Sequence, residues 1–135
     1  TLSALDGVSV AYPALLRAEK LQKRAARVGF DWRETEPVFD KLDEEIHELK
    51  EVLNTDSDRS LLEEELGDIL FTCVNIARRL KLDPETALHK ANQKFTKRFQ
   101  FIEKSLKEEL NIKPESADFS DLENRWTRSK LIDNE

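Results

Sequence analysis

Two segments, residues 42–49 (LDEEIHEL) and 62–69 (LEEELGDI), carry the same pattern, and this repeat restricts the fold more than any other feature of the chain. Both read leucine, acid, Glu, Glu, apolar, any residue, acid, apolar. Apolar residues that recur three and four positions apart form one stripe of a helix. The repeat therefore predicts two amphipathic helices of the same design.

The acids of each segment fall at a defined place on its helix. Successive residues are rotated by about 100°, so Glu45 and Glu48 lie about 60° and 120° from Leu42, on one flank of the apolar stripe. Glu65 and Asp68 take the same two positions on the second helix. If the two helices pack as an antiparallel pair, these four carboxylates converge beside the core.

Four neighbouring carboxylates repel one another and raise one another's pKa values. A bound cation removes this repulsion, and oxygen ligands together with substrate phosphates suit Mg²⁺. The alternative is a solvated acidic face that pairs with basic helices. Gly67 costs about 1 kcal/mol inside a helix, and it leaves room either for a substrate or for a close neighbouring helix.

The rest of the chain also shows helical signals. Glycines (3) and prolines (4) are few, and no segment alternates as a strand would. We predict an all-α fold: an antiparallel four-helix bundle-like core with a short C-terminal helix. One domain is expected over 1–135, with its core at about 13–130. The expected helices are 13–28, 35–53, 60–80 (with Ser57 as an alternative start), 84–110 and a last one from Ser120, with N-caps at Thr35, Ser60, Asp83 and Ser120.

Charge and cysteine content exclude several classes of protein. The net charge of −6 argues against a binder of nucleic acid polymers. Residues 31–68 hold fifteen acids and four basic residues, whereas 11–30 and 69–110 each carry a net charge of +4. The blocks fit either helices that pair their charges or a metal site beside a phosphate site.

The location of the protein follows from the same composition. Cys73 is the single cysteine, which fits a reducing compartment, and we expect it to be a packing residue on a buried stripe. No apolar run approaches the roughly 18 residues that span a membrane, and no basic-then-apolar leader is present. We therefore expect a cytoplasmic protein with no membrane partner.

The acidic segments carry a family signature. Residues 44–48 (EEIHE) followed by 65–68 (ELGD) resemble the E-E-x-x-E … E-x-x-D signature of the MazG family of nucleoside triphosphate pyrophosphohydrolases. The flanking stretches are similar to the C-terminal catalytic domain of two-domain bacterial MazG. The likeness covers about 13–130, so 1–12 would be a linker remnant and the N-terminal repeat would be absent. The flanking stretches are 13–18, 22–24, 28–32, 74–78, 90–95 and 98–99.

The resemblance implies that an all-α homodimer hydrolyses a nucleoside triphosphate to the monophosphate and pyrophosphate, by attack of water at the α-phosphorus with Mg²⁺ or, as a substitute, Mn²⁺. It assigns catalysis and metal binding to Glu45, Glu48, Glu65 and Asp68. It assigns nucleotide contacts to Lys41, residues 61–64, Lys94, Lys97, Arg98 and Trp126. Glu44 and Glu64 are candidates to orient or deprotonate the water. Leu61 stands where a relative can have a basic residue.

The basic residues and the tryptophan also have simpler explanations. Lys94, Lys97 and Arg98 are three and four apart, so they can face one triphosphate or form a solvated basic face. Trp126 can stack on a base or close the core.

Two other functions remain open at this level. A related all-α enzyme, such as a dimeric dUTPase or a phosphoribosyl-ATP pyrophosphohydrolase, would share the metal site and differ in its base pocket. A non-catalytic helical interaction module would release no pyrophosphate from any triphosphate.

Overall fold

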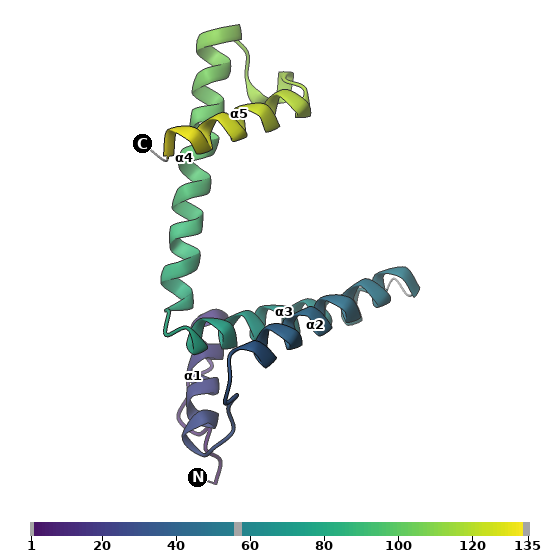
Figure 1. Cartoon of the computed structure of the whole chain (residues 1–135), viewed down its shortest axis with the longest axis vertical. Coiled ribbons are helices and arrows are strands. Elements are labelled where there is room, and N and C mark those ends of the chain that lie inside the picture. The colour runs from purple at the N-terminus through teal and green to yellow at the C-terminus, as the bar shows by residue number, and fades with distance from the viewer. Residues whose placement is uncertain (1, 56–57, 134–135) are drawn as a thin grey trace. The chain divides into compact units, whose positions relative to one another are not determined.

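The fold is all-α, as predicted. The computed structural model describes residues 2–55 and 58–133, and within these ranges it contains helices and turns but no strand (Figure 1). The short C-terminal helix is also confirmed. In chain order the elements are α1 (Ala14–Arg27), α2 (Glu36–Thr55), α3 (Arg59–Arg79), α4 (Pro84–Leu110), a 3-10 turn η1 (Pro114–Ser116) and α5 (Phe119–Asp133).

The predicted helix limits differ from the observed ones by no more than two residues, but two caps were predicted wrongly. The N-cap of α3 is Asp58, whose carboxylate accepts a hydrogen bond of 3.0 Å from the backbone N–H of Ser60. Asp is as strong an N-cap as Ser, so the earlier residue starts the helix. Ser120 lies inside α5, which begins at Phe119. The alternative start at Ser57 lies outside the described residues.

The helices divide into two compact units, Thr1–Ala87 and Leu88–Glu135, and each is described by itself. In the first unit α2 and α3 lie side by side as an antiparallel pair, as predicted, and α1 packs on α3 (Figure 1). Val38 of α2 and Val74 of α3 are fully buried there. The expectation of one domain over 1–135 stays a prediction.

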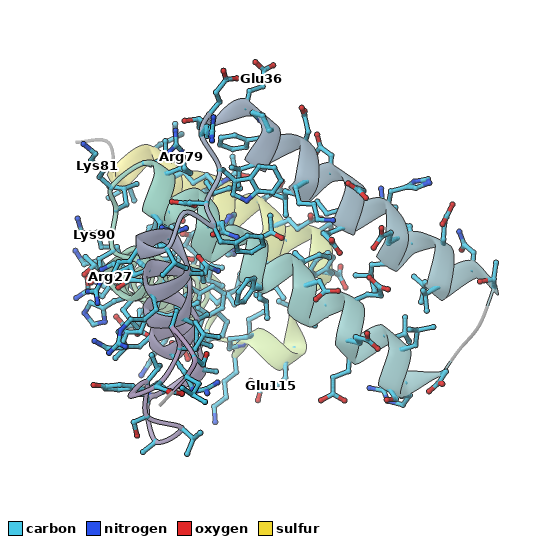
Figure 2. All side chains as sticks on the ribbon, turned by 90° about the horizontal axis from the view of Figure 1, so that it is seen from below. Arg27, Glu36, Arg79, Lys81, Lys90 and Glu115 are labelled. Atoms are coloured by element: carbon cyan, nitrogen blue, oxygen red, sulfur yellow. The ribbon has the colours of Figure 1, made fainter. Side chains whose placement is uncertain are left out.

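Side-chain hydrogen bonds link α1 and the connector 28–35 to α3. Gln22 is buried and donates to the backbone carbonyl of Phe71 (3.0 Å), while its own side-chain oxygen accepts from Arg78 Nε (3.0 Å). Arg78 also donates to Asp31 Oδ1 (2.8 Å). Arg79, labelled in Figure 2, donates to the backbone carbonyl of Trp32 (3.2 Å). The connector is therefore held from the α3 side.

The second unit has its own small core. Ile102 and Leu106 of α4 are buried, Leu106 completely. Arg125 of α5 is also buried, and it donates to Ser105 Oγ (2.9 Å) and Asp121 Oδ1 (3.1 Å). Because both partners are present, the guanidinium is stabilised despite its burial.

The expected apolar stripe of α3 is only partly buried. Cys73 is exposed and Leu66 is 48% exposed, so the interpretation of Cys73 as a packing residue was wrong. Helix α3 packs against both α2 and α1, and the residues that become buried are Thr72 and Val74, on the two flanks of the expected stripe. In the described part of the chain, no helix has both the length and the apolar character needed to cross a membrane.

Candidate functional site

Three carboxylates from two helices converge in the first unit. Glu45 of α2 and Glu65 and Asp68 of α3 each place one oxygen within 4.8 Å of the others. Glu45 is only 5% exposed, Glu65 is half-buried and Asp68 is exposed. The carboxylate cluster formed by these three residues thus has a buried end and an end that is open to solvent.

Two oxygens of the carboxylate cluster lack a hydrogen-bond donor among the described residues. They are Oε2 of Glu45 and Oε2 of Glu65, and both are buried. A buried acceptor without a partner costs about 1–3 kcal/mol, and more when it is charged. A hard divalent cation prefers such oxygen ligands, so these residues fit a metal ion.

The fourth predicted ligand, Glu48, lies close to the cluster but its oxygens are not within the 4.8 Å group. Glu48 is half-buried on α2. Its pKa is raised, first by its own desolvation and then by the negative charges of Glu45, Glu65 and Glu44, with Lys41 acting in the opposite direction. The structure therefore brings three of the four carboxylates together and leaves Glu48 within their electrostatic field.

Lys41 contacts the other carboxylate oxygen of Glu45, and the sequence did not predict this ion pair. Its ammonium lies 2.9 Å from Glu45 Oε1 and 3.7 Å from Glu44 Oε1. The hydrogen bond to Glu45 is the main reason that the pKa of Lys41 is raised. The sequence does contain a signal for this ion pair, because Lys41 and Glu45 are four residues apart on one helix. Glu44 and Glu64, the candidate bases, are both exposed.

Gly67 lies on α3 between two residues of the cluster. Apart from its chain neighbours and the nearby backbone of its own helix, no heavy atom of the described chain lies within 4 Å of the place where a Cβ would be. The structure thus gives no support to close helix packing as the reason for this glycine, and open space remains beside the carboxylates.

Four further predicted residues belong to the second unit. Lys94 and Lys97 are exposed on α4. Arg98 places its Cζ 5.3 Å from the centroid of the Trp126 ring, and the Phe95 ring lies 5.7 Å from the same ring. Trp126 is half-buried. A cation and an aromatic ring beside it hold this indole in place.

The fold and the cluster together define an all-α protein with a carboxylate site suited to a divalent cation. Comparison with protein families makes this more specific. The chain belongs to the family of the MazG nucleotide pyrophosphohydrolase domain, whose model matches residues 33–101. The matched segment contains the three clustered carboxylates, Glu48, and the predicted contacts Lys94, Lys97 and Arg98 of α4.

Curated relatives agree with this assignment. The chain is 44% identical over 129 residues to the nucleoside triphosphate pyrophosphohydrolase of Escherichia coli, covering 95% of the chain and 49% of the relative. It is 39% identical over 128 residues to the nucleoside triphosphate pyrophosphohydrolase/pyrophosphatase MazG of Thermotoga maritima, covering 95% and 48%. The chain therefore spans about half the length of these curated relatives.

Proposed function

We propose that this chain hydrolyses nucleoside triphosphates to the monophosphate and pyrophosphate with the help of Mg²⁺. The observation that carries the proposal is the carboxylate cluster with its two buried, unbonded oxygens, in a chain of the MazG family. The activity named for the E. coli relative supports it. Mn²⁺ would serve as a substitute because it prefers the same oxygen ligands.

Glu45, Glu65 and Asp68 would hold the ion, and Glu48 would join them from the next turn of α2. When bound, a divalent cation supplies an acidified water as nucleophile and neutralises charge on the phosphate oxygens. The water would form a bond to the α-phosphorus while the bond from that phosphorus to the bridging oxygen breaks. Pyrophosphate then leaves with the electron pair of the broken bond.

The proton of the water needs an acceptor near the cluster. Glu44 and Glu64 are exposed carboxylates that neighbour the ligands in sequence, so either is available to orient the water and accept its proton. Lys41 would stabilise negative charge at the same place, because its ammonium already lies against Glu45.

Four residues of the second unit are the proposed nucleotide contacts. Lys94 and Lys97 supply point charges for phosphate oxygens and Arg98 supplies paired donors. Trp126 offers a face on which a base can stack. We further propose that the enzyme works in the cytoplasm, since its single cysteine fits a reducing compartment. We also propose that it is a homodimer, as the family resemblance implies.

The test is pyrophosphate release from each common NTP and dNTP, with Mg²⁺ and with EDTA. We expect release only with the metal. Glu65→Gln should abolish turnover while the helical circular dichroism persists. Asp43→Asn is the matched control, because Asp43 is an exposed acid of α2 that lies outside the cluster and outside the predicted nucleotide contacts. Metal-independent release, or equal activity of both variants, would refute the proposal.

A further inference from the structure

A concave site lies in the first unit, apart from the carboxylates. It is a pocket of about 280 Å³ between the turn at residues 4–7 and one face of α1. We name it the basic pocket, because four of its seven lining residues are cations. The lining residues are Gly7, Val8, Tyr12, Lys20, Lys23, Arg24 and Arg27.

The four cations form one face of α1. Their positions, 20, 23, 24 and 27, are spaced three, four and seven apart, so the side chains are surface neighbours. Like charges at these spacings destabilise a helix. Arg27 lies in the last turn of α1 and is exposed (Figure 2). Such a face gains stability when negative charge binds to it.

The acids beside the basic pocket are too few to neutralise it. Glu19 accepts a hydrogen bond of 3.2 Å from Lys23. The carboxylate of Asp6 accepts one of 3.2 Å from the backbone N–H of Ser3. Even when both acids are counted in full, four positive charges face two negative ones. Lys20 lies over the Tyr12 ring, 4.9 Å from its centroid, and this contact adds no negative charge.

The wall opposite α1 is fixed in place. Arg24 donates a hydrogen bond of 2.6 Å to the backbone carbonyl of Asp6. The next residue, Gly7, has φ +88°, and a Cβ there would lie 3.5 Å from Arg24 Nη2. That distance is an ordinary van der Waals contact, so glycine is required here for the backbone conformation alone. The basic pocket is thus shaped before any ligand arrives.

We infer that the basic pocket binds a small oxyanion with several negative charges, of the size of inorganic pyrophosphate. Lysine ammonium groups and arginine guanidinium groups are the side chains that bind phosphate oxygens. Sites for drug-sized ligands have volumes of about 300–1,000 Å³, so this pocket suits a ligand smaller than a whole nucleotide. Pyrophosphate as the physiological ligand rests on the proposed function, whereas the binding of the anion does not.

The test is a titration of the ¹⁵N-labelled chain with sodium pyrophosphate in EDTA, followed by amide chemical shifts in NMR spectra. We expect saturable shifts at Gly7, Val8 and residues 20–27. Sodium chloride at the same ionic strength should not reproduce them. The double variant Lys20→Gln/Arg27→Gln should bind at least about tenfold more weakly, because two charged contacts are lost.

The matched control is Lys50→Gln/Lys107→Gln, which removes two exposed lysines outside the basic pocket and should bind as the parent does. Should the double variant fail to fold, Arg27→Gln alone tests the same point, since this exposed side chain makes no ion pair among the described residues. Shifts confined to residues 94–98, shifts reproduced by chloride, or unchanged affinity of the pocket variants would overturn the inference. Loss of hydrolysis in Glu65→Gln with intact binding would separate this site from the proposed function.

Discussion

Replacement of Lys41 by methionine tests whether the Lys41 ammonium and a metal ion compete for the carboxylate of Glu45. In the structure Lys41 Nζ provides the hydrogen bond to Glu45, at 2.9 Å, while the second oxygen of Glu45 has no donor among the described residues. Lys41→Met would leave both oxygens of a buried carboxylate without a protein partner. The apo protein should therefore lose stability.

The size of this loss follows from the burial of the two partners. A hydrogen bond to a charged group contributes about 1.5–3 kcal/mol. The side chain of Lys41 is 38% exposed, so solvent screening reduces this value, and we expect a loss of about 1–2 kcal/mol in EDTA. When Mg²⁺ is bound it replaces the positive charge of the lysine, and the loss should shrink.

By thermodynamic linkage, the difference between the stability losses without and with Mg²⁺ equals a change in the free energy of Mg²⁺ binding. If the loss disappears in the metal-bound protein, Lys41→Met binds Mg²⁺ about 5- to 30-fold more tightly than the parent, because 1.4 kcal/mol corresponds to a factor of ten. Isothermal titration without nucleotide measures this affinity, and urea unfolding followed by circular dichroism measures the stability.

The control is Lys50→Met, an exposed lysine of the same helix, which should change neither quantity. An equal loss of stability with and without Mg²⁺, or weaker metal binding by Lys41→Met, would refute the view that the ammonium and the ion compete for Glu45.

Three further predictions concern stability. Leu106→Ala should destabilise the second unit by about 2–5 kcal/mol, because this side chain is completely buried; urea unfolding of the variant checks it. Asp58→Ala should cost about 0.5–2 kcal/mol through loss of the α3 N-cap, visible in thermal unfolding, whereas Asp58→Ser should recover most of it. The pKa of Glu109 lies below its usual 4.5, chiefly because Arg128 donates a hydrogen bond to it. Its stabilisation is therefore present above pH 4.5 and is lost as the pH falls through the lowered value, so Glu109→Gln should flatten the acid limb of a plot of melting temperature against pH.

The helices could be predicted from the sequence because their signals are local. Apolar spacing and the Asp83-Pro84 start place α4 with the limits that the structure has. The cap of α3 was missed because Asp58 and Ser60 are both good caps two residues apart, and local propensity does not choose between them. The exposure of Leu66 and Cys73 depends on which face of α3 meets its neighbours, and this is decided by tertiary packing.

The carboxylate site was predictable to a similar degree. The repeat places Glu45, Glu65 and Asp68 on matching flanks of paired helices, and the structure brings them together. Glu48 has the same flank position by sequence, yet its oxygens are not within the group, since a helical wheel gives angles and not side-chain reach. The role of Lys41 was hidden for the same reason: four-residue spacing permits an ion pair without requiring one.

The contacts of Arg78 have a consequence for synthesis of the chain. Its guanidinium meets Asp31, 47 residues earlier, and Gln22, 56 residues earlier, so a long loop must close before either bond forms. Helix α1 can form soon after it leaves the ribosome, since its backbone bonds are local, but the connector after it waits until residue 78 has emerged. The first unit therefore completes its folding near the end of its own translation. A nascent polypeptide that ends within α3 before residue 78 would lack the hydrogen bonds of Arg78 to Asp31 and Gln22.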